Sequence, residues 1–283
     1  MSEDRELIGL AFDGGVATVT LQRQEKRNAL TAAMVRTLLT TVSGAAARDD
    51  VKVIVVRGEG RDFCSGFDVA DPRDFEGSVE DSRRVRLASI REKADWMREL
   101  LQCEKPLVMS VHGACVGIGT YLVLVADFAI VTSDAALGLP EERFGSAGAT
   151  WAYPYLIREI GMKRANEIVM TGRRVSADEA LSYGLVNRVV GLGELATATD
   201  DLARALCTLP REGIALNRTV KQLALSVSGH LTSFDFHSVT HALAERMQRE
   251  ADEFDFMAHI ARDGMRAAVE ERNRRFAGEW WGW

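Results

Sequence analysis

The sequence predicts an α/β body followed by a helical C-terminal part. Strand patterns alternate with helix patterns from the start of the 283-residue chain, and from about Leu192 onward the pattern is helical only. Alternating strands and helices form a sheet covered by helices, whereas a terminal run of helices packs as a layer of its own. No Pro- or Ser-rich linker separates the two parts, so we expect them to pack closely.

The first elements are a hairpin, a helix and a buried strand. Leu7–Phe12 and Val16–Leu21 alternate in polarity around an Asp-Gly-Gly turn, which indicates two antiparallel strands. Thr31 is a candidate N-cap for a helix that runs to about Arg48. Val51–Arg57 is mostly apolar, as buried parallel strands are.

The middle of the chain continues this alternation. Asp71–Ser82 is polar and charged, and we expect it to be mobile. Pro106–Val111 and Asp127–Thr132 are predicted strands, and Gly117 to about Val125 is a predicted helix. Apolar residues at helical spacings of three and four predict an earlier helix that contains Leu87, Ile90, Ala94, Met97 and Leu101.

A further helix has clear start and stop signals. Ser176 and Glu179 form a predicted capping box, and Gly184 is expected to end the helix before a Leu-Val strand at 185–186.

Composition limits the class of protein. Hydrophobic residues make up 47 % and charged residues 27 % of the chain, which suits a globular protein with one large core or one core plus an appendage. The net charge of −6 does not favour nucleic acid as a partner. We find no signal peptide, and the apolar run Tyr121–Val131 is too short for a membrane span. We expect a cytoplasmic protein with no nucleic-acid or membrane partner.

The four cysteines give no sign of a metal site. Their spacing matches no metal-ligand pattern, and a chain without a signal peptide usually keeps its thiols reduced. The cysteines are Cys64, Cys103, Cys115 and Cys207.

Two small-residue bends carry the main chemical signal. Residues 62–68 read Asp-Phe-Cys-Ser-Gly-Phe-Asp, and residues 112–119 read His-Gly-Ala-Cys-Val-Gly-Ile-Gly. Each bend directly follows an apolar strand pattern and leaves backbone N–H groups exposed at the end of a strand or the start of a helix. Two such donors that converge on one carbonyl oxygen make an oxyanion hole. The pair therefore predicts chemistry on a thioester or a similar carbonyl.

Glu141 is the candidate acid/base. It follows Pro140 and lies among apolar residues, and burial would raise its pKa into a useful range. Taken on its own, the residue is better explained as the start of an exposed turn, because most glutamates are solvated.

Six segments occur together in an order and spacing that is characteristic of one superfamily. They are residues 26–30, 55–68, 105–119, 126–130, 137–145 and 171–187. With them, the chain resembles the enoyl-CoA hydratase/isomerase (crotonase) superfamily over nearly its whole length. The resemblance implies a spiral of ββα units over residues 1–195 and a C-terminal helical trimerisation region over 196–283. It also implies an acyl-CoA thioester substrate, no cofactor apart from the coenzyme A of that substrate, and a homotrimer or a dimer of trimers.

The resemblance also assigns site residues. The oxyanion donors would be the N–H groups of Phe67 and Ile118, with Glu141 and Tyr121 as the catalytic side chains. The side chains of Asp68 and Asp127 are expected to be structural. The residues expected to bind the substrate, in large part through their backbone, are Arg27, Ala29, Ser65, Gly66, Asp68, Gly117 and Trp151.

Two departures from the superfamily pattern bear on the reaction. A typical hydratase holds water between two carboxylates, and Tyr121 stands in place of the first. Tyrosine is no general base near neutral pH unless its pKa is strongly lowered, but it can form a hydrogen bond or fill the pocket. The Gly-rich segment that helps hydratases to place water is also altered, at 146–151.

A single glutamate suits double-bond isomerisation or hydratase-lyase chemistry better than simple hydration. The superfamily also contains 4-chlorobenzoyl-CoA dehalogenases, which use a nucleophilic Asp. That Asp would fall on Ala149 here, which argues against dehalogenase activity. The alternatives are a classical enoyl-CoA hydratase and a CoA-thioester-binding protein without catalysis. An RNA-binding role has only the cluster Arg83–Arg86 in its favour.

Two aromatic groups allow more than one interpretation. Trp151, Tyr153 and Tyr155 either narrow an acyl pocket or simply pack a helix. The Trp-rich end of the chain, 280–283, either packs on a neighbouring subunit or is a loose terminus.

Overall fold

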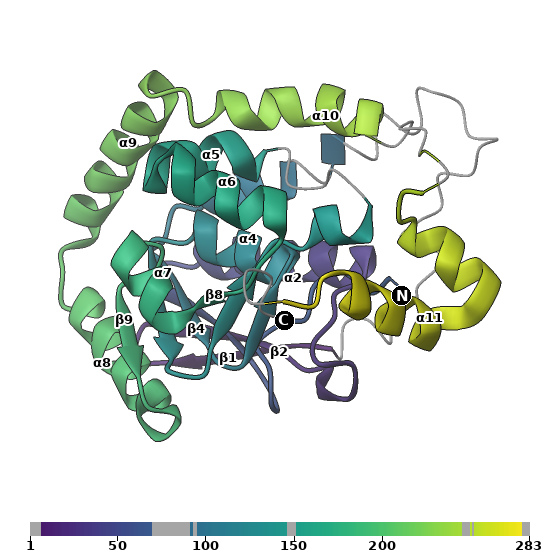
Figure 1. The fold of residues 1–283 in the computed structure, drawn as a ribbon. Helices are drawn as coiled ribbons and strands as arrows, with labels where there is room; N and C mark the ends of the chain where they lie inside the picture. Colours follow the sequence, from purple (N-terminus) through teal and green to yellow (C-terminus); the bar gives the residue numbers. More distant parts are fainter. Residues whose placement is uncertain are drawn as a thin grey trace.

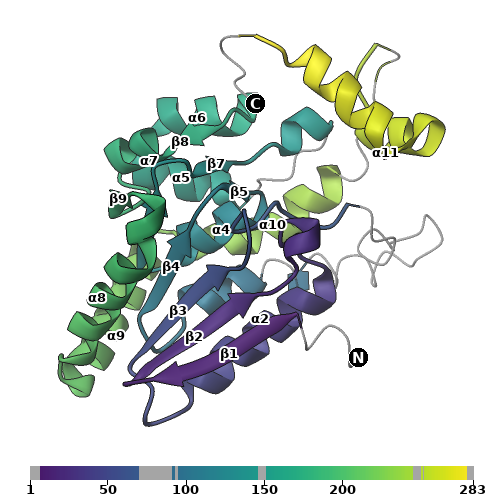
Figure 2. The same cartoon turned by 90° about the horizontal axis from the view of Figure 1, so that it is seen from below.

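A six-stranded sheet is the centre of the molecule, with strand order β1-β2-β3-β4-β6-β9. The computed structural model describes residues 7–69, 91–92, 95–145, 151–244, 250 and 252–278. Within this six-stranded sheet, β1–β2 is the one antiparallel pair and the other pairs are parallel. Figure 2 shows β1, β2, β3 and β4 side by side. The strands are β1 (Ile8–Asp13), β2 (Val16–Leu21), β3 (Val53–Gly58), β4 (Leu107–Val111), β6 (Phe128–Thr132) and β9 (Arg188–Val190).

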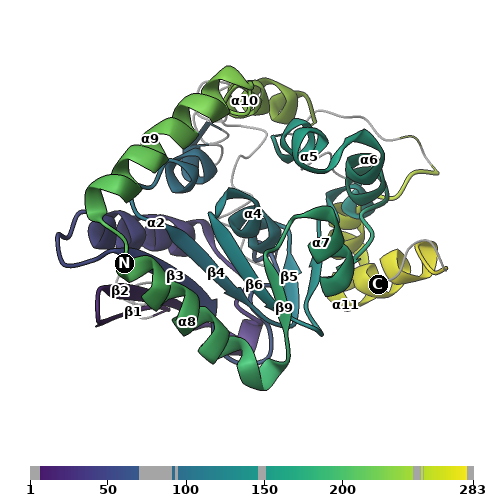
Figure 3. The same cartoon turned by 90° about the vertical axis from the view of Figure 1, so that its left-hand side faces the viewer.

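Helices cover both faces of this sheet, as Figure 3 shows for α2 and α8. The named helices are α2 (Ala32–Ala46), α4 (Ile118–Val125), α5 (Ala152–Ile160), α6 (Met162–Thr171), α7 (Ala177–Tyr183), α8 (Leu195–Cys207), α9 (Arg211–Val227), α10 (Thr232–Ala244) and α11 (Phe256–Arg275). Short 3₁₀ turns add η1 (Gln24–Lys26), η3 (Glu141–Phe144) and η4 (Leu192–Glu194).

The sequence of β3 shows why helices have to cover both faces of the main sheet. Its side chains alternate, so that Val53 and Val55 pack with Ala203 of α8 on one face. Ile54 and Val56 join the main core on the opposite face, where α2 lies. Burial on both faces explains the continuous apolar sequence of this strand. The predicted strand is confirmed, although it begins two residues later than expected.

Local signals in the sequence set the helix ends. The N-cap prediction at Thr31 is confirmed, because its side chain accepts a hydrogen bond from the Met34 N–H at 3.1 Å. The capping box of Ser176 and Glu179 is present, and Gly184 ends α7 with φ 80°. The predicted strand at 185–186 is wrong, since the Leu185 N–H still bonds the end of α7 and the strand begins at Arg188.

A second, three-stranded sheet was not predicted. It has the order β5-β7-β8, with β5 (Ala114–Val116), β7 (Ala136–Gly138) and β8 (Val175–Ser176). In the parallel pair β5–β7, Val116 is opposite Gly138. This pairing places the chain around residue 117 beside the chain that leads to Glu141.

In the described residues from Leu192 onward, helices are the only regular secondary structure, as predicted. α10 passes over α5 at the top of Figure 1, α9 runs along the left side, and α11 lies beside η3. Asp127 fixes α9 to the body, because its carboxylate accepts from Leu107 N at 2.8 Å and pairs with Arg218 and Lys221. This agrees with the structural role predicted for Asp127.

Some predictions lie outside the described residues: the stretch 71–82, the cluster 83–86, Leu87, Ile90, Ala94, Ala149 and the tail 280–283. In the part of the chain that the structure describes, no helix combines the length and the apolar character needed to cross a bilayer.

Candidate active site

The two glycine bends meet in space. Gly66 and Gly117 have φ values of 108° and 54°, which L-residues with a side chain rarely adopt. A Cβ atom placed on Gly117 would lie 3.6 Å from the Cα of Gly66, so the two bends are in van der Waals contact. The preceding segments pair as well, since the Val116 N–H donates to Cys64 O at 2.9 Å.

The two predicted oxyanion donors follow these glycines directly. Leu30 lies beside the first bend, where its N–H donates to Gly66 O and its carbonyl accepts from the Asp68 N–H. The Phe67 N–H between them makes no hydrogen bond within the described segments. The Ile118 N–H opens α4, where helix geometry provides no acceptor, and it too has no partner in those segments. In the described part of the chain, no acceptor takes up either N–H group.

Glu141 is held next to the second bend by backbone pairing. The Gly117 N–H donates to Gly138 O at 2.8 Å, and the Thr120 hydroxyl bonds both the N–H and the carbonyl of Gly138. Glu141 opens η3 three residues later, after Pro140. The carboxylate therefore belongs to the same small region as the oxyanion donors.

The Glu141 carboxylate has one bonded and one free oxygen. Its Oε1 accepts a hydrogen bond of 2.7 Å from the Tyr121 hydroxyl. Its Oε2 is buried and has no partner among the described residues, which is rare for a buried polar atom. Burial raises the pKa of Glu141, and the Tyr121 hydrogen bond partly opposes that rise. An unpaired carboxylate oxygen with a raised pKa is suited to accept and return a proton.

Tyr121 is buried, with 7 % of its surface exposed. Burial, followed by the nearby Glu141 charge, raises the pKa of its hydroxyl well above the usual value. Tyr121 therefore stays protonated and donates to Glu141. The structure brings the two predicted catalytic side chains into contact, and the geometry makes Tyr121 an orienting group for the carboxylate.

Arginines gather beside η3. The guanidinium of Arg143 donates to Thr171 O, and burial followed by repulsion from Arg272 and Arg174 lowers its pKa to about 10. Burial and then Arg27 lower the pKa of Arg174, whereas Arg272 lies over the Phe144 ring at 5.1 Å. In a protein of net charge −6, this cluster is a local positive field that suits an anionic ligand.

The loop before the first bend has an unusual backbone that the sequence analysis missed. Arg27 and Asn28 both have φ 53°, in the left-handed region. The buried Asn28 side chain holds this shape, since its amide donates to Glu59 O and Asp62 O at 2.8 Å and its carbonyl accepts from Arg23 N. Asparagine tolerates this region better than most residues, which was the available signal.

Asp62 and Asp68 stabilise the same loop through ion pairs. Asp62 bonds the Arg27 guanidinium and the Ala114 N–H. Burial alone would raise its pKa, but these two bonds lower it to about 2. Asp68 is buried and forms a 2.8 Å ion pair with Arg23, so its side chain supports the loop.

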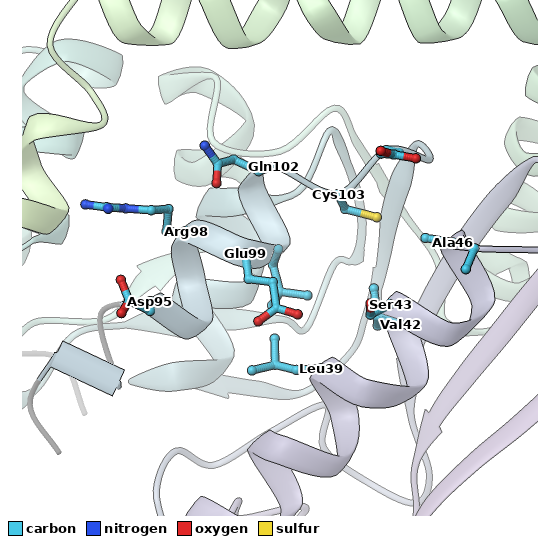
Figure 4. A pocket seen from close by; sticks show the side chains of 12 residues that line it. Leu39, Val42, Ser43, Ala46, Asp95, Arg98, Glu99, Gln102 and Cys103 are labelled. Carbon is cyan, nitrogen blue, oxygen red and sulfur yellow. The ribbon is translucent and has the colours of Figure 1, made fainter. Parts of the chain in front are cut away.

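A separate hollow lies elsewhere. Figure 4 shows it between α2 and the helical segment 95–101, with a volume of about 530 Å³. Its lining includes Asp95, Glu99 and Glu104 but neither Glu141 nor Tyr121. Its three carboxylates make it a poor match for a ligand that carries phosphates.

Comparison with known proteins agrees with this geometry. The family model described as enoyl-CoA hydratase/isomerase matches residues 11–279. The chain belongs to the enoyl-CoA hydratase/isomerase family. Among curated relatives, a Thermus thermophilus protein provisionally named enoyl-CoA hydratase is 31 % identical over 93 % of this chain and 98 % of its own. A trans-2-decenoyl-[acyl-carrier-protein] isomerase of Streptococcus mutans is 28 % identical over 94 % of this chain and 96 % of its own.

Solved structures of this family share the fold. An enoyl-CoA hydratase/isomerase from Xanthobacter autotrophicus Py2 has a TM-score of 0.82 and 29 % identity, and the match covers 96 % of this chain and 99 % of that one. An enoyl-CoA hydratase from Mycobacterium smegmatis has a TM-score of 0.83 and 26 % identity, and the match covers 98 % of this chain and 96 % of that one. The crotonase fold predicted from the resemblance is thus confirmed.

The C-terminal arginines lie on a helix beside Glu141. α11 contacts η3, the turn that Glu141 opens, in the same chain. The guanidinium of Arg143 lies over Phe276 at 5.3 Å, and that of Arg272 lies over Phe144. The segment is therefore part of the surroundings of Glu141 within one protomer.

Proposed function

We propose that this enzyme acts on an acyl-CoA thioester by moving a proton through an enolate, with Glu141 as its single acid/base. Its preferred outcome is double-bond isomerisation. The observation that carries the proposal is the Glu141 carboxylate, which has Oε1 bonded to Tyr121 and Oε2 buried without a hydrogen-bond partner in the described part of the chain. A proton shuttle needs one carboxylate oxygen in a fixed position and one free to reach the substrate.

The proposed reaction needs no further reagent. Glu141 removes a proton from carbon 2 of a 3-enoyl thioester, and the electron pair moves to the thioester oxygen. The N–H groups of Phe67 and Ile118 stabilise the resulting enolate oxygen. Glu141 then gives its proton to carbon 4 as the double bond shifts to carbons 2 and 3, which regenerates the carboxylate.

The substrate class is supported by the charge around the site. The phosphates of coenzyme A are anionic, and Arg143, Arg174 and Arg272 form a positive cluster beside η3. The backbone of Arg27 and Ala29, together with Ser65 and Gly66, is proposed to hold the rest of the coenzyme A part. Coenzyme A therefore enters as part of the substrate, and we propose no separate cofactor.

Hydration is disfavoured because Tyr121 replaces a carboxylate. With its pKa raised by burial, its phenol has no capacity to deprotonate water, and Glu141 would have to act alone. Hydratase-lyase chemistry is the second candidate, since Glu141, held by the Tyr121 hydroxyl, can also move the proton when a carbon–carbon bond is cleaved.

Isotope labelling distinguishes these outcomes. We expect 3-enoyl-CoA esters incubated with the enzyme in deuterated water to show double-bond movement with deuterium incorporation, by NMR and mass spectrometry. Water addition to crotonyl-CoA should be slower than for a two-glutamate hydratase measured beside it, because one acid/base group is worth about 10²–10⁴-fold. Equally fast hydration would reject the proposal. Binding without any exchange would identify a non-catalytic CoA-binding protein.

A Tyr121→Phe variant should shift the acid limb of the pH–rate profile to higher pH. The Tyr121 hydrogen bond lowers the pKa of Glu141, so its loss raises that pKa further. Proton abstraction needs the ionised carboxylate, and a higher pKa means that ionisation is lost at a higher pH. The measurement is kcat/KM against pH. Tyr153→Phe is the control, because its hydroxyl bonds Asn166 and does not touch Glu141. An unmoved limb in Tyr121→Phe would contradict the role of this bond.

We also propose that α9 forms the surface through which the chain assembles into a homotrimer or a dimer of trimers, within the region 196–283. One face of α9 carries four apolar side chains that are 56–81 % exposed: Leu216, Val220, Leu223 and Val227. Arg218, on the opposite face, is buried against the body. An aligned apolar stripe of this kind marks an interface, and a trimer repeats one heterologous interface three times.

Leu223→Glu should therefore reduce the oligomer to smaller species, because it places a charge in the middle of the stripe. Light scattering coupled to gel filtration measures the mass. Ser226→Glu, on the same helix but beside the stripe, should leave the mass unchanged. A wild-type protein that is monomeric at micromolar concentration would reject the assembly.

A further inference from the structure

We propose that Trp151 and Phe234 form the end wall of the acyl pocket and limit the length of the acyl chain. The inference rests on the proposed function, because it takes Glu141 as the position of the reacting carbons. It assigns the selectivity to α10, a helix that is remote in sequence from both glycine bends.

A continuous set of ring contacts leads from the carboxylate to α10. The Tyr121 ring, whose hydroxyl holds Glu141, packs against Trp151 with 5.0 Å between centroids. Trp151 stacks on Phe234 at 4.8 Å with an interplanar angle of 20°. Tyr155 meets the edge of Trp151 at 6.0 Å. The space beyond Tyr121 is therefore occupied by rings.

These rings are fully buried. Trp151 is 2 % exposed and Phe234 is 1 % exposed. Close-packed interiors contain few voids larger than a water molecule, so an acyl chain can extend past Tyr121 only by displacing a ring. Phe234 differs in this from Phe236 on the same helix, which is 62 % exposed.

Polar contacts hold the helix that carries Phe234. Arg98 pairs with Asp235, the residue after Phe234, and its guanidinium lies 5.7 Å from the Phe234 ring. Before α10, His230 bonds Glu159 of α5 at 2.7 Å. α10 is thus tied on one side to the helical segment 95–101 and on the other to α5, so the backbone that carries Phe234 is held in place from both sides.

The wall gives a clear expectation for ligand length. An acyl chain gains about fourfold in affinity for each methylene that it buries, until it reaches the rings. Beyond that length, each added carbon has to stay in water or displace the Trp151–Phe234 stack, so affinity stops rising and falls.

The experiment measures binding of saturated acyl-CoA esters, from butanoyl- to dodecanoyl-CoA, by calorimetry. Saturated esters report binding without turnover. For the wild type we expect the affinity to peak within the short end of the series. Phe234→Ala should raise the affinity for decanoyl-CoA at least tenfold and change that for butanoyl-CoA less than twofold. Phe236→Ala is the matched control and should keep the wild-type profile.

Phe234→Leu provides a second test if the alanine variant unfolds, because leucine fills more of the site. Phe234→Leu should shift the acyl chain length of highest affinity toward longer chains, but by fewer carbons than Phe234→Ala does. A wild type that binds dodecanoyl-CoA more tightly than butanoyl-CoA would overturn the inference, and so would folded Phe234 variants with an unchanged profile. A wild type that binds no acyl-CoA at all would overturn the proposed function itself.

Discussion

Glu141→Gln is expected to remove most of the turnover, by about 10²–10⁴-fold in kcat, which is the usual worth of an acid/base group. The amide keeps the size of the side chain and can still accept from the Tyr121 hydroxyl, so the site should remain assembled. The affinity for the thioester should stay similar, because a proton shuttle contributes mainly in the transition state. Steady-state kinetics with a verified substrate and calorimetry with a saturated acyl-CoA measure the two effects.

Glu142→Gln is the matched control for this variant. Glu142 belongs to the same 3₁₀ turn but is exposed to solvent. Its replacement removes an equal charge one residue away, so a fall in kcat limited to Glu141→Gln is specific to the buried carboxylate. Unchanged turnover in Glu141→Gln would reject the assignment.

Local patterns in the sequence predicted the fold elements well. The main-sheet strands before residue 133 follow apolar runs or alternation and lie within two residues of their predicted bounds. Thr31 and Ser176 were recognisable as caps because capping depends on side chains within one helical turn. β5, β7 and β8 were missed because two or three residues are too few to show a period of two.

Contacts between residues that lie far apart in the sequence could not be predicted from local sequence patterns. The bond between Tyr121 and Glu141 joins side chains twenty positions apart, and no spacing rule predicts it. The resemblance to the family suggested that both belong to one site, but the direction of the hydrogen bond came from the structure. The stack of Trp151 on Phe234 depends on how α10 packs, which a helical pattern alone does not determine.

The backbone donors are the hardest part of the site to test, because a side-chain substitution leaves the N–H in place. Ile118→Pro removes one of them. Ile118 is the first residue of α4, where proline fits the helix and where the N–H has no intrahelical partner. The helix should therefore persist, while the enolate oxygen loses one of two donors. We expect kcat to fall by about 10²–10³-fold, the cost of one oxyanion-hole donor.

Ile118→Ala is the control for Ile118→Pro. It also removes the buried side chain, which is 1 % exposed, but it keeps the N–H group. Both variants should lose stability, since a buried isoleucine truncated to alanine costs about 2–5 kcal/mol. Only the proline variant should lose the hydrogen bond that grows as the enolate forms. Thermal melting compares the stability of the two, and kcat compares their catalysis. If the proline and alanine variants turn over equally fast, the Ile118 N–H does not bind the enolate oxygen, and the carbonyl must be polarised by another group.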